Sequence, residues 1–442
     1  MTLMENIYLT LTIAINKYQI TRPESYLIFK MRNDSFRPNI LIMIISILLF
    51  ANSFSVAMAK SISNETNGSK LLDVSKTDTI KVTNVDDKLE PAIKEFIINK
   101  VLNKSKSSMV IGFIDPNGTK VYSFGNISDT NNAPVDGNTI YDIDSLTKTF
   151  TTLALANMVK DGIVNLDDPI EKFLPTNVSA PQFNGFDITL ADLATHTSGL
   201  PYMPSNIWVN ETAGEINSAY SISDLYEGLS NTTLLSKPGT KFLYSDFGMG
   251  LLGQILIHIE GEGTTYEQLV KNRILNVLGM NDTKISLSED ELLNRLPDGH
   301  LNGSTVLTPK IPDSIAAAGA FHSTTNDMLK YLAANMGLLH TSLDDSIHLQ
   351  HLIRHSVQMQ NPLNYYEYVA LGWGILSNLS IELLNHQGSF LGWNSFIGFI
   401  PSEQKGIVIL CSCDKSDVNT KSLGIVLLGL SEPSLLTSPK NK

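Results

Sequence analysis

Residues 141–159 read YDIDSLTKTFTTLALANMV, an apolar stretch that carries Ser145 and Lys148 three positions apart. Its large side chains are apolar nearly all round, which predicts a buried helix. On a helix, positions i and i+3 lie on one face, so the serine hydroxyl and the lysine amine are neighbours. Burying a lysine costs free energy unless the amine is paired or takes part in chemistry. The stretch therefore indicates a nucleophilic serine beside a lysine.

A serine hydroxyl is a weak nucleophile until a neighbouring group takes its proton. Burial lowers the pKa of a lysine, so Lys148 is a candidate for that base. The chain contains three S-x-x-K patterns, and the other two, Ser402–Lys405 and Ser412–Lys415, lie in a polar turn and at a strand end. Only the first pattern opens an apolar helix, so we interpret the other two as accidental.

The segments on either side of this helix predict the fold class. Residues 89–104 have helical spacing, and two short strands over 108–125 are joined by the turn DPNGT. Three further strand-like runs occupy 381–388, 393–403 and 404–413, and the last helix candidate covers 417–430. Strands at both ends of the chain, with helices between them, predict an α/β sandwich interrupted by a helical insertion.

The composition bounds the function. The chain has 442 residues, of which 43% are hydrophobic and 17% charged, so it can form a sizeable core. Its net charge of −12 argues against nucleic acid as a partner. Cys411 and Cys413 are two residues apart, so on a strand their side chains lie side by side on the same face, a geometry that suits a disulfide poorly. We interpret both as small core residues rather than as a bridge or a metal-binding pair.

The N-terminal extension, residues 1–59, has the features of a secretory signal peptide. Basic residues Lys30, Arg32 and Arg37 precede an apolar segment at 40–50, and Ala57 and Ala59 follow in an A-x-A arrangement. We expect cleavage after Ala59 and a secreted or extracytoplasmic protein. An uncleaved segment that anchors the chain in a membrane stays open, as does a true start at Met31.

The remaining boundaries follow from composition. Residues 60–87 are polar and indicate a linker, 88–432 form the expected hydrolase domain, and 433–442 form a C-terminal tail. Eleven N-x-[ST] sequons that follow residue 59 are possible glycan sites, and we expect some to be used. They are Asn64, Asn67, Asn103, Asn117, Asn126, Asn177, Asn210, Asn231, Asn281, Asn302 and Asn378.

A series of ordered segments resembles the serine β-lactamase and penicillin-binding-protein superfamily. The similarity is greatest to the branch with class C β-lactamases, D-alanyl-D-alanine carboxypeptidases and related esterases. The segments lie between residues 89 and 430, and they are 145–175, 188–201, 237–256, 273–285, 316–337 and 385–401. The resemblance implies a β-lactamase-like sandwich, α/β (α+β) in class, with a central antiparallel sheet flanked by helices and an inserted helical subdomain.

The resemblance also implies roles for individual residues. Ser145 is the nucleophile, and Tyr244-Ser245-Asp246 matches the family's Y-x-N motif, so Tyr244 takes part in proton transfer as a phenolate or through Lys148. Asp246 replaces the family's asparagine at a substrate-binding position. A carboxylate there keeps Lys148 protonated and cannot donate to a substrate amide. Tyr244 is then the expected general base.

The third motif, K-T-G or H-x-G in the family, matches His386-Gln387-Gly388. The resemblance implies that the backbone N–H groups of Ser389 and Ser145 form the oxyanion hole. His386 and Gln387 contact the substrate, and Gly388 allows close backbone approach.

The sequence thus predicts an exported serine hydrolase that forms an acyl-enzyme with an amide or ester donor. A small-molecule or peptide substrate such as a D-alanyl peptide, a β-lactam or an ester fits, without metal or organic cofactor. A catalytically impaired relative that serves as a cell-surface binding module stays open. We expect His196 to hold a loop, whereas Trp373 lines the cleft or packs in the core.

Overall fold

The computed structural model describes residues 90–104, 106–128, 130–210, 215–307, 310–357, 366–378 and 380–436. The signal peptide, the linker at 60–87 and residues 437–442 of the tail therefore lie outside the described residues. The tail's first residues form the 3-10 helix Pro433–Leu436. No helix in the described ranges combines the length and the apolar character needed to cross a membrane.

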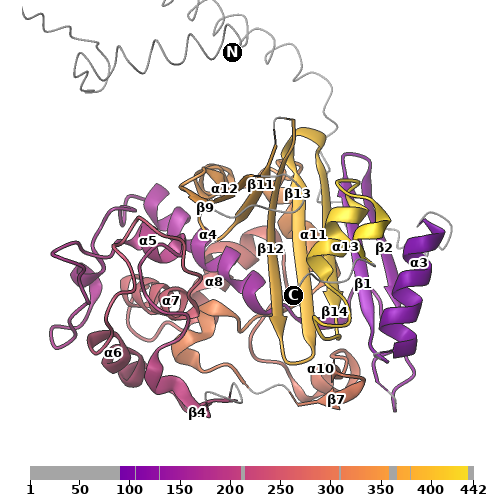
Figure 1. Cartoon of the computed structure of the whole chain (residues 1–442), viewed down its shortest axis with the longest axis horizontal. Coiled ribbons are helices and arrows are strands. Elements are labelled where there is room, and N and C mark those ends of the chain that lie inside the picture. The colour runs from indigo at the N-terminus through magenta and orange to yellow at the C-terminus, as the bar shows by residue number, and fades with distance from the viewer. Residues whose placement is uncertain are drawn as a thin grey trace, which may run out of the picture. The chain divides into compact units, whose positions relative to one another are not determined.

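The centre of the fold is an eight-stranded sheet in which every neighbouring pair of strands is antiparallel (Figure 1). The strand order is β2-β1-β14-β13-β12-β11-β10-β9. The bounds are β1 Met109–Asp115, β2 Gly118–Phe124, β9 His355–Val357, β10 Tyr366–Val369, β11 Gly374–Ser377, β12 Glu382–Phe390, β13 Trp393–Ile400 and β14 Lys405–Cys411. The expected antiparallel sheet, with strands from both ends of the chain, is confirmed.

Helices cover both faces of this sheet. Side chains alternate between the faces along each strand, so Ile111 packs with α3 (Pro91–Ile97) and α13 (Thr420–Leu427), in a cluster that includes Ile97 and Leu423. Its neighbour Val110 belongs to the larger cluster with α4 (Thr147–Lys160) and α11 (Thr325–Asn335). The expected sandwich is therefore confirmed.

The helical insertion lies between β3 (Ile140–Asp142) and β8 (His322–Thr324), which pair with each other outside the main sheet. Figure 1 shows most of its helices gathered beside the sheet. Besides α4, the insertion contains the helices α5 Leu190–Ala194, α6 Ile222–Ser230, α7 Asp246–Glu260, α8 Tyr266–Val270, α9 Asn276–Leu278 and α10 Glu289–Asn294. It also contains two small pairs of strands. In the first, β4 (Trp208–Asn210) pairs with β5 (Glu215–Ile216), and in the second, β6 (Gly299–Leu301) pairs with β7 (Ser304–Val306). Helix α12 (Asp344–His351) follows α11 and packs against α4.

The stretch 141–159 is not one continuous helix. It begins in β3, passes through a 3-10 turn at Asp144–Leu146 and becomes α-helical only at Thr147. Asp144 has a φ of +42°, a left-handed value that interrupts a right-handed helix. Ser145 therefore lies on a tight turn ahead of the helix, while Lys148 lies in its first turn.

Helix α4 is buried, as predicted, and its threonines have specific partners. The Thr152 hydroxyl donates to the Leu371 carbonyl at 3.0 Å, and the Thr151 hydroxyl donates to the Ala317 carbonyl at 2.8 Å. Buried hydroxyls need such acceptors. The threonines thus tie α4 to two neighbouring segments of the chain.

Cys411 and Cys413 lie in the core, as expected, but they form a disulfide, so the expectation that they are not bridged is wrong. Strand β14 ends at Cys411 and the chain then bends, which leaves the two Cα atoms 5.2 Å apart. That separation lies within the usual disulfide range. The expectation failed because it assumed that the extended strand continued through both residues.

Candidate active site

Ser145 and Lys148 are in direct contact. The Lys148 side chain has no exposed surface, and its Nζ donates to Ser145 Oγ at 2.9 Å and to the Ala318 carbonyl at 2.6 Å. The 3-10 turn presents the serine at the start of α4, and the first helical turn brings the lysine back beneath it. The predicted pair is therefore assembled.

Asp246, the first residue of α7, forms an ion pair with Lys148 at 2.7 Å. Burial by itself lowers the pKa of Lys148, but its interactions with Asp246, Tyr244 and Asp144 outweigh burial and raise that pKa above its ordinary value. Lys148 is therefore a cation at neutral pH and donates its hydrogen bonds. The ion pair expected between Asp246 and Lys148 is therefore present, and it favours the protonated lysine.

Tyr244 lies against both members of the pair. Lys148 Nζ is 4.9 Å from the centre of the Tyr244 ring, and the hydroxyl forms hydrogen bonds with Lys148 and Ser145. Burial and the charge of Asp246 raise the pKa of Tyr244 to about 12, although Lys148 acts in the opposite direction. The phenolate expected from the sequence is therefore a minor form near neutral pH.

His196 holds the loop that carries Tyr244. Its Nδ1 accepts a hydrogen bond from the Ser245 N–H at 3.1 Å, and its ring centre lies 4.4 Å from that of Tyr244. Burial and the charge of Lys148 keep the pKa of His196 well below its usual range, so the ring is neutral. Ser245 Oγ caps α7 by accepting from Gly248 N–H at 2.9 Å.

Strand β12 packs on the Ser145 turn through Gly388. A Cβ atom on Gly388 would overlap the Ile143 carbonyl and Ser395 Oγ, and it would lie 3.1 Å from the Ser145 nitrogen. Ser395 Oγ donates to the Ile143 carbonyl at 2.9 Å. Glycine is thus required at this position for the close approach of two backbones.

The N–H groups of Ser145 and Ser389 converge on one side chain that the sequence analysis did not consider. Asp144 Oδ2 accepts a hydrogen bond from the Ser389 N–H at 2.6 Å, and the same carboxylate accepts one from the Ser145 N–H. The two predicted oxyanion-hole donors therefore lie within reach of a single anion. The only sign of this in the sequence was the position of an acidic residue, Asp144, directly before Ser145.

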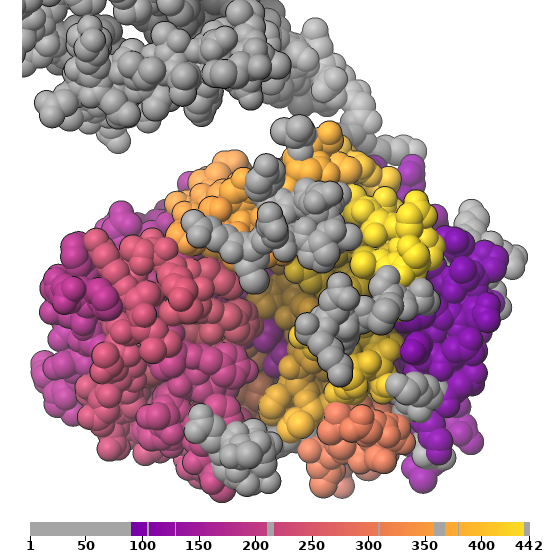
Figure 2. Space-filling model, viewed as in Figure 1, coloured from indigo at the N-terminus to yellow at the C-terminus, as the bar shows by residue number. Residues whose placement is uncertain are grey.

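The site opens into a cleft of about 340 Å³ between the helical insertion and the sheet, where Figure 2 shows a hollow. The cleft walls combine the predicted site residues with others from several elements. They include Asp144, Ser145, His196, Tyr202, Phe242, Tyr244, Trp373, Asn385, His386, Gln387, Ser389, Lys415 and Lys421. Trp373 is both a cleft residue and a buried core residue.

Polar groups on the sheet side of the cleft are in position to contact a ligand. The Gln387 side-chain nitrogen is buried and has no hydrogen-bond partner within the described residues. Burial and the charge of Lys148 lower the pKa of His386 to about 3, so its imidazole is neutral. His386 Nδ1 lies 3.1 Å from the Gln387 carbonyl. A neutral His386 cannot attract a substrate carboxylate by charge.

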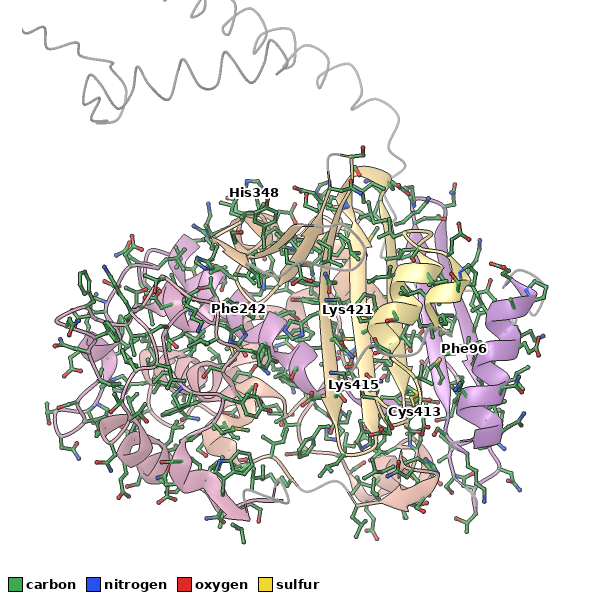
Figure 3. All side chains as sticks on the ribbon, in the orientation of Figure 1. Phe96, Phe242, His348, Cys413, Lys415 and Lys421 are labelled. Atoms are coloured by element: carbon green, nitrogen blue, oxygen red, sulfur yellow. A yellow bond between two sulfur atoms is a disulfide. The ribbon has the colours of Figure 1, made fainter. Side chains whose placement is uncertain are left out.

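Two lysines bring positive charge to the cleft. Lys421, in the first turn of α13, and Lys415, between β14 and α13, both line the cleft, opposite Phe242 of the helical insertion (Figure 3). Burial lowers the pKa of Lys421, and the like charge of Lys415 acts in the same direction, whereas Glu367 opposes it. Ser412 and Lys415 do not form a catalytic pair, but Lys415 lines the cleft. The S-x-x-K spacing gave no sign of this position.

Among the residues described, no three His, Cys, Asp or Glu side chains are grouped so that they could hold a metal ion.

Comparison with known proteins adds to this geometry. The chain is 30% identical over 236 residues to the D-alanyl-D-alanine-carboxypeptidase/endopeptidase AmpH of Escherichia coli K12, an alignment that covers 51% of this chain and 56% of that protein. The chain therefore spans about half the length of this curated relative. An octameric penicillin-binding protein homologue from Pyrococcus abyssi superimposes with a TM-score of 0.66 and 26% identity, covering 76% of this chain and 77% of the other.

A class C β-lactamase from Rhodobacter sphaeroides shares the fold, with a TM-score of 0.62 and 21% identity, covering 77% of this chain and all of the other. The sequence profile described as Beta-lactamase matches residues 90–429, from just before α3 to just after α13. With the fold, the ordered motifs and the Ser145–Lys148 pair in agreement, the chain belongs to the β-lactamase family.

Proposed function

We propose that the protein is an exported serine hydrolase that transfers an acyl group from an amide or ester donor to Ser145 and then to water. The observation that carries the proposal is the 2.9 Å hydrogen bond from Lys148 Nζ to Ser145 Oγ at the floor of the cleft. A buried cation at this distance stabilises the serine alkoxide as the hydroxyl proton leaves.

The arrangement supports a definite order of proton transfers. Ser145 Oγ attacks the acyl carbonyl carbon while its proton passes to the Tyr244 phenolate, and Lys148 stays charged through its ion pair with Asp246. Tyr244 then gives that proton to the leaving amine or alcohol, and the acyl-enzyme forms. In deacylation, Tyr244 accepts a proton from water and returns it to Ser145 Oγ as the free acid leaves.

The lysine pair favours acyl donors that carry a carboxylate. Lys415 and Lys421 face the cleft, and neither forms an ion pair among the described residues. A substrate carboxylate would offset the cost of keeping the partly buried Lys421 charged. D-alanyl peptides end in such a group, and a relative's name as a D-alanyl-D-alanine carboxypeptidase agrees with this substrate class.

Replacing Lys421 by glutamine is expected to raise KM about tenfold for a peptide that ends in D-Ala-D-Ala, because one charge-assisted contact is lost. The kcat should change little. The same peptide with a C-terminal amide should show no difference between wild type and the variant. Steady-state kinetics on both peptides measures the effect.

Lys405→Gln is the matched control, because Lys405 is 56% exposed, pairs with Glu403 and does not line the cleft. Its kinetics should equal those of the wild type. An equal loss on the carboxylate and amide peptides in Lys421→Gln would contradict recognition of a carboxylate by this lysine.

One observation favours a second candidate, a binding module with impaired catalysis: the Asp144 carboxylate already contacts the N–H of Ser389. A fluorophosphonate probe separates the two candidates. Labelling that disappears in Ser145→Ala supports the hydrolase, and absence of labelling in the intact protein from pH 6 to 10 supports the binding module.

Export rests on the N-terminal segment, which lies outside the described residues. We expect the mature protein to begin at Lys60. Mass spectrometry of the protein recovered from the medium tests this, and a mature chain that still contains residues 40–50 would support a membrane anchor instead.

A further inference from the structure

The oxyanion hole predicted for this site is occupied by a side chain of the protein itself. We propose that the Asp144 carboxylate is an internal ligand of the hole, which the acyl oxygen of the substrate must displace, so that Asp144 limits the rate of acylation. The inference rests on the proposed function, because it concerns the same nucleophile and the same two N–H groups.

The geometry of the hole carries this inference. Asp144 Oδ2 lies 2.6 Å from the Ser389 nitrogen, and the carboxylate also accepts from the Ser145 N–H. In acyl transfer, these two donors must point at the oxygen that becomes negatively charged. Because each N–H has one hydrogen, the carboxylate and the substrate oxygen compete for the same two hydrogen bonds.

The backbone directs Asp144 into this position. The residue has a φ of +42°, a left-handed value that aspartate adopts more readily than most residues. Its own N–H donates to Asp142 Oδ1 at 2.8 Å, which fixes the turn. A Cβ atom at Gly319 would lie 2.9 Å from Asp144 Oδ1, so a side chain at residue 319 would crowd the carboxylate in this position.

The charges around Asp144 make the contact one that a substrate can displace. Burial and the nearby Asp246 disfavour its charged form, whereas Lys148 and the two backbone N–H groups favour it. The balance raises the pKa of Asp144 above its ordinary value. The surroundings thus favour the charged carboxylate less than its 2.6 Å contact with the Ser389 N–H alone would indicate.

A purely structural role for Asp144 would be to tie β12 to the nucleophile turn. Other contacts already do so, since Ser395 Oγ bonds to the Ile143 carbonyl at 2.9 Å and Gly388 packs on that same backbone. The two roles predict opposite results. If Asp144 serves only to tie β12 to the turn, removing its carboxylate should slow acylation. If the carboxylate is an internal ligand of the oxyanion hole, removing it should speed acylation.

The test uses two variants of the full-length protein. Asp144→Gly removes the carboxylate and suits the left-handed backbone, and Asp144→Asn keeps the size and the backbone preference while removing the charge. The rates to be measured are labelling of Ser145 by a fluorophosphonate and acylation by p-nitrophenyl acetate. If the Asp144 carboxylate leaves the oxyanion hole for about 1–10% of the time in the wild type, Asp144→Gly should be acylated about 10- to 100-fold faster than the wild type. The acylation rate of Asp144→Asn should lie between those of the wild type and Asp144→Gly.

A second readout reports on the hole directly. Phenylboronic acid forms a tetrahedral adduct with an active serine and places one oxygen in the oxyanion hole. Its inhibition constant should fall in Asp144→Gly by about the same factor as acylation rises, since the same competitor has been removed. Asn184→Gly is the control: Asn184 is exposed, has a φ of +51° and lies away from the cleft, so its rates should equal those of wild type.

The outcomes separate the two proposals. Faster acylation and tighter boronate binding in Asp144→Gly support the inference. If wild type is labelled at Ser145 and both Asp144 variants react at the same rate or more slowly, the inference is overturned and the proposed function stands. If neither wild type nor the variants are labelled at Ser145, the proposed function fails, and this inference fails with it.

Discussion

Replacing Ser145 by alanine is expected to abolish hydrolysis of p-nitrophenyl acetate while the thermal unfolding midpoint changes by less than about 2 °C. Removal of a catalytic nucleophile typically costs about 10⁶-fold in kcat. The stability should persist because Lys148 keeps its contacts with the Ala318 carbonyl and with Asp246 when Ser145 Oγ is gone. Initial rates and a thermal melt measure both effects.

A variant that retains more than about a tenth of wild-type activity would remove Ser145 from the role of nucleophile. Ser402→Ala is the matched control, because this serine belongs to an S-x-x-K pattern in the exposed turn after β13. Its activity should equal that of the wild type. A large loss in the control would mean that the assay reports on folding.

Replacing Asp246 by asparagine is expected to move the alkaline rise of kcat/KM to lower pH by about one to two units. In the wild type, the pKa of Tyr244 is about 12, so activity that depends on the phenolate should rise across the whole range from pH 6 to 10. Asp246 contributes to that high value through its negative charge. Without the charge, the phenolate forms more easily and the pKa of Tyr244 falls.

At neutral pH, a shift of one unit corresponds to about a tenfold gain in kcat/KM for an ester, because the phenolate fraction rises by that factor. Asparagine also supplies an amide donor, so the ratio of β-lactam to ester activity should rise. Asp161→Asn is the control, since Asp161 pairs with Arg273 at 2.9 Å and does not line the cleft. An unchanged profile together with an unchanged ratio would show that Asp246 does not act on this site.

The sequence predicted the parts of the site that depend on local spacing and motif order. Ser145 and Lys148 are three residues apart, so one turn and the start of a helix bring their side chains together. Tyr244 and Asp246 belong to one short motif, so they lie close to each other. The strands near the two ends of the chain were also predictable from their apolar patterns, whereas their antiparallel arrangement followed from the family resemblance. The disulfide at Cys411 was missed because one bend in the chain changed the distance between its two cysteines.

Other features depend on contacts between distant segments and therefore had no local signal. Asp144 is 245 residues from Ser389, and only packing of β12 on the turn brings them together. Lys415 and Lys421 reach the cleft because the chain leaves β14 beside it. A single sequence records the identity of these residues but not which strand will lie next to them.

The pairing of β1 with β14 has a consequence for the order in which the protein is built. Ser108, just before β1, donates its N–H to Ser412 Oγ across 304 residues, so the sheet closes only after almost the whole domain has been synthesised. Contacts this far apart in sequence slow folding. When Ser145 and Lys148 leave the ribosome, β12 has not yet been synthesised. A nascent or truncated chain therefore has Ser145 but lacks the Ser389 N–H. The pair of N–H groups from Ser145 and Ser389 is therefore complete only when synthesis of the domain is nearly finished.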